Sequence, residues 1–315
     1  MSTRRTAVKT LAMLAVLAAF PVTQAYAADA QPKVALVMKS LANEFFQTME
    51  EGAKAHQAAH ATEYTLIANG IKDESDTAAQ IKIVQQMIVE KVDAIVLAPA
   101  DSKALVPVVK EATDKGVLVV NIDNKLDEGV LKEKGLSVPF VGPDNRKGAK
   151  LVGDYLAKQL KAGDKVGILE GVSTTFNAQQ RTAGFQDAMK AVGANVVSLQ
   201  SGQWEMEKAN KVASAMLREH PDVKALLCGN DDMALGVVAA VKTAGKTGKV
   251  LVVGYDNINA VKPLLNNGEL LATADQFAAK QAVFGIETAL KALKDKTPQN
   301  SLPGSVETQV VLVTK

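Results

Sequence analysis

Residues 33–68, KVALVMKSLANEFFQTMEEGAKAHQAAHATEYTLIA, decide the fold of this chain. The segment 33–38 predicts a buried strand, because it is short and mostly apolar. Apolar residues then recur every three or four positions over 45–59, which predicts an amphipathic helix. The segment 64–68 predicts a second strand. A strand, a helix and a strand in this order are the unit from which parallel sheets are built.

The same alternation continues along the rest of the chain, and it starts again after Asp144, where Lys165 and Val166 open a strand as Lys33 and Val34 do. It predicts parallel sheets covered by helices on both faces. We therefore expect an α/β fold of two similar doubly wound lobes. Further strands are expected at 94–98, 117–122, 165–169, 195–199, 224–228, 250–255 and 270–274, and helices at 76–90 and 102–115.

The N-terminus has the pattern of a signal peptide. Arg4, Arg5 and Lys9 precede the uncharged apolar run 11–20, and small residues follow at Ala25 and Ala27. The run is too short to span a membrane, so cleavage after Ala27 is expected. Ordinary secretion is favoured over the twin-arginine route, because a basic start is common to all such peptides.

Composition excludes several partners. The chain has 36 Lys plus Arg and 34 Asp plus Glu, and residues 1–27 hold three bases and no acids, so the mature net charge is 33 minus 34, or −1. A nearly neutral chain without a basic block argues against nucleic acid and anionic membranes. The single cysteine, Cys228, lies in an apolar segment and cannot form an internal disulfide, so we expect a buried, inert thiol.

Polar and aromatic residues follow the predicted strands. In open α/β sheets ligands bind beyond the carboxyl ends of the strands, so these residues are the candidates for a binding site. They are Asn43, Phe45 and Phe46 after the first strand, Asp123 and Asn124 after the fourth, and Asn230, Asp231, Asp256, Asn257, Asp275 and Gln276 after later strands.

Six stretches, in order, resemble the periplasmic ribose/galactose-type sugar-binding proteins, which are periplasmic binding proteins of type I and relatives of the ligand domains of lactose-repressor-like regulators. The resemblance covers nearly the whole mature chain. The stretches are 41–46 (LANEFF), 121–124 (NIDN), 181–185 (RTAGF), 229–236 (GNDDMALG), 253–257 (VGYDN) and 272–276 (ATADQ).

The resemblance implies a monosaccharide site between the lobes. A sugar hydroxyl both donates and accepts, which suits carboxylates, amides and arginine, whereas the sugar's C–H faces suit flat aromatic rings. The implied ligand is a pentose such as ribose, or a related small sugar or polyol. Asn124 stands where the ribose-binding pattern has arginine, and Trp204 where it has phenylalanine. The loss of the arginine counts against ribose itself, and a different pentose, a polyol or a small hexose could fit. The implied polar contacts are Asn43, Asp123, Asn124, Asn177, Arg181, Asn230, Asp256 and Gln276, and the implied stacking contacts are Phe45, Phe46 and Trp204.

The resemblance also implies lobe boundaries and partners. The first lobe is expected at 33–142 plus 277–304 and the second at 143–276 plus 305–315, with hinge crossings near 141–144, 274–277 and 302–306. Closure of the lobes would be read by the permease and ATPase of an ABC importer. A chemoreceptor could read the same closed form. No cofactor or metal is implied, and a monomer is expected.

Some of these residues also have structural interpretations. Asn230 and Asp231 could cap the following helix, and we expect Asp231 to cap and Asn230 to bind. Trp204 lies in a polar neighbourhood, which favours an exposed stacking role over core packing.

Other function classes fit less well. Gly245-Lys246-Thr247 lacks the earlier glycine of a phosphate loop, and His56 and His60 lack the rest of a metal motif. A glycosidase using two of Asp123, Asp231 and Asp256 remains an alternative, since sugar sites and carboxylate pairs overlap. A repressor would need a DNA-binding domain before the first strand.

Overall fold

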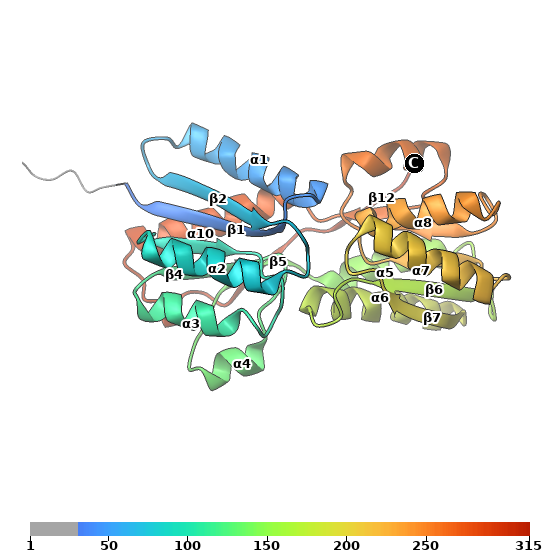
Figure 1. Ribbon diagram of the computed structural model, residues 1–315, viewed down its shortest axis with the longest axis horizontal. Helices are drawn as coiled ribbons and strands as arrows, with labels where there is room; N and C mark the ends of the chain where they lie inside the picture. Colours follow the sequence, from blue (N-terminus) through green and yellow to red (C-terminus); the bar gives the residue numbers. More distant parts are fainter. Residues whose placement is uncertain (1–30) are drawn as a thin grey trace, which may run out of the picture. The chain divides into compact units, whose positions relative to one another are not determined.

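The computed structural model describes residues 31–315, which form one compact unit. Helices and strands alternate along it, and the helices surround two parallel sheets that the strands form (Figure 1). The predicted fold class is therefore confirmed. We call the elements around the six-stranded sheet the first lobe and those around the four-stranded sheet the second lobe. The predicted signal peptide, residues 1–27, lies outside the described residues. No described helix is long and apolar enough to cross a membrane.

The first sheet has the strand order β11-β5-β4-β3-β1-β2, and all neighbouring strands are parallel. Helices α1 and α10 cover one face, where Val34 and Leu36 point, and α2 and α3 cover the other, where Ala35 and Val37 point. Burial on both faces explains why β1 is a continuous apolar run. The elements are β1 (Lys33–Ser40), α1 (Glu44–Ala59), β2 (Thr65–Ile71), α2 (Thr77–Val89), β3 (Ala94–Leu97), α3 (Val106–Asp114), β4 (Leu118–Ile122), α4 (Glu128–Glu133), β5 (Phe140–Pro143), α10 (Ala278–Lys294), η2 (Gln299–Ser301) and β11 (Ser305–Thr308).

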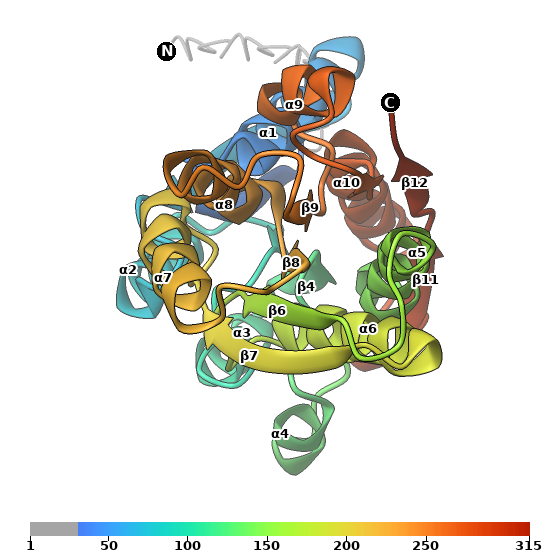
Figure 2. The same ribbon diagram turned by 90° about the vertical axis from the view of Figure 1, so that its right-hand side faces the viewer.

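The second sheet has the order β7-β6-β8-β9, again parallel. A parallel bridge from Val253 to Ala272 connects it to the antiparallel pair β10 and β12. Helices α5 and α6 lie on one side of the sheet and α7 and α8 on the other (Figure 2). The elements are α5 (Asn145–Ala157), β6 (Lys165–Glu170), α6 (Phe176–Val192), β7 (Asn195–Ser201), α7 (Met206–Glu219), β8 (Ala225–Cys228), α8 (Asp231–Thr243), β9 (Leu251–Val253), η1 (Asn259–Val261), α9 (Lys262–Asn267), β10 (Thr273–Asp275) and β12 (Val311–Val313).

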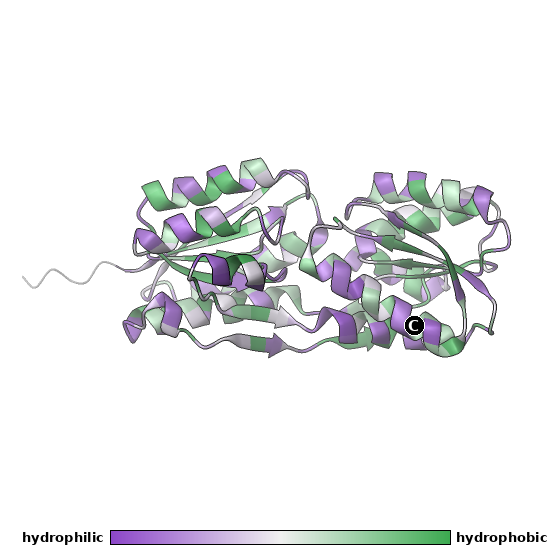
Figure 3. Ribbon diagram, turned by 90° about the horizontal axis from the view of Figure 1, so that it is seen from below, coloured by the Kyte–Doolittle hydropathy of each residue, from purple (hydrophilic) through white to green (hydrophobic). Residues whose placement is uncertain are grey.

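Apolar side chains concentrate in the sheets. Figure 3 colours the central strands of the second sheet as hydrophobic, whereas the flanking helices carry bands of both colours. Cys228 ends β8 within this core, where burial raises the pKa of its thiol well above the ordinary value. The thiol is therefore buried and protonated, as the sequence predicts.

Two of the predicted hinge crossings, 141–144 and 302–306, overlap strands of the first sheet. Residues 141–144 largely belong to β5, which lies between β4 and β11. Residues 305–308, expected in the second lobe, form β11 in the first sheet, so the chain leaves the first lobe only at Gln309. Neither segment has an apolar run of its own, and pairing with a neighbouring strand decides its conformation. The chain passes between the lobes after β5, after β10 and after β11.

Candidate functional site

Ten of the eleven predicted site residues surround one cavity between the lobes. Most of them follow a strand or lie in the first turn of a helix, at the end of the sheet where parallel strands present their carboxyl ends, and Arg181 lies in the second turn of its helix. The side chains close in on this cavity, and the volume open to the centre of a water molecule is about 10 Å³. The lining residues are Asn43, Phe45, Phe46 and Asp123 from the first lobe, Asn177, Arg181, Trp204, Asn230, Asp256 and Gln276 from the second lobe and its crossing, and Lys39 and Glu74, which sequence reasoning missed.

Arg181 organises the polar wall of the second lobe. Its Nε donates to Asn145 Oδ1 at 2.7 Å and its Nη1 donates to the Gly229 carbonyl at 2.9 Å. Nη1 also lies 3.5 Å from Asp256 Oδ1, which accepts from Gln276 Nε2 at 2.6 Å. Burial raises the pKa of Asp256, and the Arg181 guanidinium opposes that shift. The wall therefore offers a fixed donor fork beside a carboxylate.

Aromatic rings from both lobes contribute to the cavity. Phe45 and Phe46 occupy the first turn of α1, where their rings meet edge to face with centroids 5.1 Å apart. Trp204 comes from the turn before α7 and is only 3% exposed. The prediction that it is exposed is therefore wrong. The lobes enclose the ring together, which a sequence read one segment at a time does not reveal.

Glycines make room for Trp204. A Cβ atom on Gly171 would lie 1.9 Å from the indole, and one on Gly229 would lie 3.1 Å from it. Gln203 and Trp204 both have left-handed backbone, with φ of 53° and 67°. This turn, which is costly for side chains other than glycine, carries the indole into the cavity.

Lys39, Glu74 and Asp123 form a buried charge cluster in the first lobe. Lys39 Nζ lies 3.3 Å from Asp123 Oδ2 and 3.6 Å from Glu74 Oε2. Burial alone would lower the pKa of Lys39, but Asp123 and Glu74 hold it above the ordinary value. Burial raises the pKa of Glu74 to about 7, and Lys39 opposes this. The ammonium group also faces the rings of Phe46 and Trp204, at 5.3 and 5.4 Å from their centroids.

Three polar atoms of the cavity have no hydrogen-bond partner within residues 31–315: Glu74 Oε2, Asp123 Oδ2 and the Trp204 indole nitrogen Nε1. The two carboxylate oxygens still form ion pairs with Lys39 Nζ, so of these three atoms only the indole nitrogen lacks any polar partner among the described residues, which costs about 1 to 3 kcal/mol. Two acceptors and one donor in one small cavity suit a ligand that carries several hydroxyl groups.

The helix caps differ from the prediction. Asn230, not Asp231, is the N-cap of α8, and its Oδ1 accepts the amide hydrogen of Met233 at 3.0 Å. Asp231 is instead buried against Thr273, whose hydroxyl donates to both carboxylate oxygens at 2.8 and 3.0 Å. Its carboxylate does not line the cavity, so it adds nothing to a catalytic pair there.

Asn124 is the predicted site residue that does not line the cavity. Its Nδ2 donates to the Pro99 carbonyl at 2.9 Å, and its Oδ1 accepts the amide hydrogen of Asn177 at 3.1 Å. Its neighbour Ser102 accepts the amide hydrogen of Phe176 in the same way, at 2.9 Å. Asn124 thus joins the first lobe to the start of α6 at the side of the cavity.

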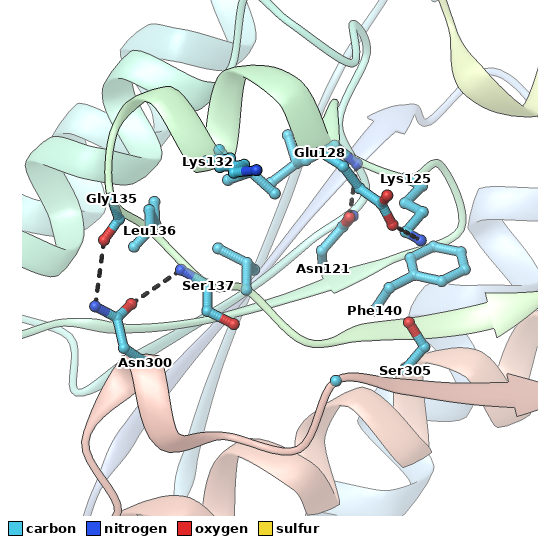
Figure 4. Close-up of a pocket in the computed structure, with 14 residues that line it drawn as sticks. Asn121, Lys125, Glu128, Lys132, Gly135, Leu136, Ser137, Phe140, Asn300 and Ser305 are labelled. Atoms are coloured by element: carbon cyan, nitrogen blue, oxygen red, sulfur yellow. Dashed lines mark hydrogen bonds and ion pairs between the residues drawn. The ribbon is translucent and has the colours of Figure 1, made fainter.

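A larger cavity lies under α4 in the first lobe (Figure 4). None of the predicted site residues lines it. The amides around it bond to the protein: Asn300 accepts from the Ser137 amide and donates to the Gly135 carbonyl, and Asn121 accepts from the Leu126 amide. No described group of three or more His, Cys, Asp or Glu side chains is arranged to hold a metal ion. The interlobe cavity is therefore the candidate site.

Known proteins resemble this chain in sequence. Residues 34–297 match the family model described as periplasmic binding protein domain. The D-ribose/D-allose-binding protein of Pseudomonas aeruginosa is 70% identical over 90% of this chain and 89% of its own length. The ribose import binding protein RbsB of Escherichia coli is 34% identical over 94% of this chain and 96% of its own length.

Two solved structures have the same fold as this chain. An ABC transporter solute-binding protein from Burkholderia multivorans, with an unknown ligand represented as alpha-D-erythrofuranose, is 73% identical, with a TM-score of 0.89 over 90% of this chain and 99% of that one. A solute-binding protein from Actinobacillus succinogenes with bound D-allose is 34% identical, with a TM-score of 0.83 over 90% of this chain and 98% of that one. This chain therefore belongs to the periplasmic binding protein family, among the ribose-type sugar-binding members that serve ABC transporters.

Proposed function

We propose that the chain is the solute-binding component of an ABC importer and holds one D-allose or D-ribose molecule in the interlobe cavity. The observation that carries this proposal is the cavity's combination of aromatic rings with the charged cluster of Lys39, Glu74 and Asp123, beside an indole nitrogen that has no hydrogen-bond partner within the described residues. The relative at 70% identity is named for both sugars, and a relative with bound D-allose shares the fold.

The contacts divide between the lobes. We infer that side chains of both lobes form hydrogen bonds with the sugar hydroxyls. In the first lobe Lys39 would donate, Asp123 and Glu74 would accept, and the Asn43 amide could do either. In the second lobe Arg181 would donate and Asp256 would accept. A sugar held by one lobe then supplies contacts to the other. It favours the closed form by the difference between its affinities for the two forms.

The lobe boundaries follow from the sheets. We propose that residues 33–142 plus 277–308 move as the first lobe and 143–276 plus 309–315 as the second, which shifts the last predicted boundary from 304 to 308 because β11 pairs in the first sheet. The signal peptide 1–27 would direct the mature chain to the periplasm, where it would be a monomer. The permease would there bind the closed form.

The test is calorimetric titration of the mature chain, residues 28–315, with D-allose and D-ribose. D-Glucose and D-xylose are matched controls, because each differs from its partner sugar only in the configuration at C3. We expect one-to-one binding of D-allose or D-ribose and at least tenfold weaker binding of the epimers. A folded chain that binds neither sugar would overturn the proposal.

The ligand should be returned unchanged. The proposed role is binding alone, so chromatography of a long incubation should recover only the sugar that was added. A hydrolysed, oxidised or phosphorylated product would instead support the enzymatic alternative.

A further inference from the structure

Glu44 joins the two lobes outside the sugar cavity. It is the first residue of α1, between the cavity residues Asn43 and Phe45, but its own side chain does not line the cavity. Its Oε1 accepts the amide hydrogen of Asn259 at 2.7 Å, and its Oε2 accepts that of Ala260 at 3.1 Å. One carboxylate from the first lobe thus receives two adjacent amides of the second.

The contact joins elements that pack within different lobes. Helix α1 packs on α10, β1 and β2 of the first lobe, whereas η1 packs on α8 and α9 of the second. No side chain of the second lobe caps η1, so Glu44 supplies acceptors that the start of η1 otherwise lacks. Separating the lobes would return both amides to water.

We propose that Glu44 is a positioning residue that stabilises the closed form and thereby raises sugar affinity without contacting the sugar. The inference rests on the proposed function. Hydrogen bonds to a charged group are stronger than neutral ones, and two amides on one carboxylate fix its geometry. A contact made only in the closed form raises the population of that form, and the apparent affinity rises in proportion.

This role differs from sugar recognition in a measurable way. A residue that contacts the sugar changes the ranking among sugars, whereas a closing contact changes the affinity for every sugar by the same factor. It also acts after encounter, so its loss accelerates dissociation and leaves association nearly unchanged.

The test compares Glu44→Ala and Glu44→Gln with Glu51→Ala, a control that removes an exposed glutamate from the same helix. We expect Glu44→Ala to weaken D-allose and D-ribose binding by about tenfold each, through faster dissociation, with an unchanged unliganded melting temperature. Glu44→Gln keeps one acceptor and should fall between this variant and the parent. Glu51→Ala should bind like the parent.

Amide hydrogen exchange at Asn259 and Ala260 gives a second measurement. Within the described residues Glu44 is the acceptor of both amides, so Glu44→Ala should abolish their protection in the sugar-saturated protein. Unchanged affinity with unchanged protection would overturn the inference. A changed ranking of sugars would overturn it as well, because it would place Glu44 at the sugar.

The two proposals fail in different ways. If the parent binds neither sugar, the proposed function is wrong. If the parent binds sugar and Glu44→Ala binds it equally well, only the role of Glu44 is wrong.

Discussion

Asp256 holds a backbone conformation that side chains rarely adopt, with φ of 123°, and the next residue, Asn257, is left-handed with φ of 57°. Such strain persists only where the surroundings determine it, and here Arg181 and Gln276 hold the carboxylate. The pattern after β9 predicted a ligand-facing aspartate but not its strain. The strain supports a binding role over a simple turn.

Replacing Asp256 by alanine should weaken sugar binding at least a hundredfold. An ionised carboxylate that accepts two hydroxyl hydrogens contributes about 1.5 to 3 kcal/mol for each bond. Calorimetry should show a similar loss for D-allose and D-ribose. The unliganded melting temperature should also fall, because Arg181 loses a buried counter-charge. A less than tenfold loss of affinity would show that the sugar lies elsewhere.

Trp204 is the only tryptophan, so its fluorescence reports on the cavity alone. Sugar binding should change the emission, because the indole nitrogen has no partner within the described residues and would gain one. Trp204→Ala should weaken binding by about 1 to 3 kcal/mol. Unaltered emission at saturating sugar would exclude contact between the ring and the ligand.

The sequence predicted most cavity residues because they follow strands in recognisable stretches. The sequence did not predict Lys39 and Glu74 as cavity residues. Lys39 lies at the end of an apolar strand, and Glu74 lies in the polar segment 72–76, where nothing distinguishes it from Asp73. Their role depends on three chain segments meeting. Asn124 was expected in the cavity because it follows Asp123, but its side chain turns toward Pro99 and α6.

At the scale of elements, the turn before α7 fits because Gly171 has no side chain. Gly171→Ala should displace the indole, since its Cβ would come within 2.2 Å of three ring atoms. We expect weaker sugar binding and a shifted tryptophan emission in the unliganded protein. Gly304→Ala is the control, because its Cβ would meet nothing within 4 Å. Equal affinities of the two variants would contradict this interpretation.

Strands with an apolar run were predictable and strands without one were not. The segments Phe140–Pro143 and Ser305–Thr308, FVGP and SVET, contain too few apolar residues to indicate a strand. Their partners in the sheet determine them, through the parallel pairing of Ser305 to Thr308 with Phe140 to Pro143. Hence the alternation of strands and helices could be derived from the sequence, but the sheet to which β11 belongs could not.

At the scale of the whole molecule, closure places charges of like sign together. Burial, and to a smaller extent the charges of Glu44 and Glu205, together raise the pKa of Asp232 to about 6. Glu44 belongs to the first lobe and Asp232 to the second, so part of this shift arises only on closing. A proton on Asp232 therefore favours the closed form.

Sugar affinity should accordingly be greatest at low pH, below the pKa that Asp232 has in the open form, and decline as the pH rises through about 6. The direction follows because the pKa is higher in the closed form than in the open one, so the proton's contribution is lost on deprotonation. Each unit of pKa shift due to closing corresponds to about tenfold in affinity. Titrations between pH 5 and 8 should show a smaller decline for Asp232→Asn. Parallel pH profiles would exclude Asp232 as the cause.

The buried thiol at the end of β8 has a practical consequence. Because Cys228 is the only cysteine, fully buried and with a raised pKa, thiol-selective dyes should not react with the folded protein. A cysteine introduced at exposed Ala260 would be the single reactive group, placed where the lobes meet. A dye attached there would change its surroundings on closing. The native chain therefore needs one substitution, and no removal of its own cysteine, to become an optical sensor for its sugar.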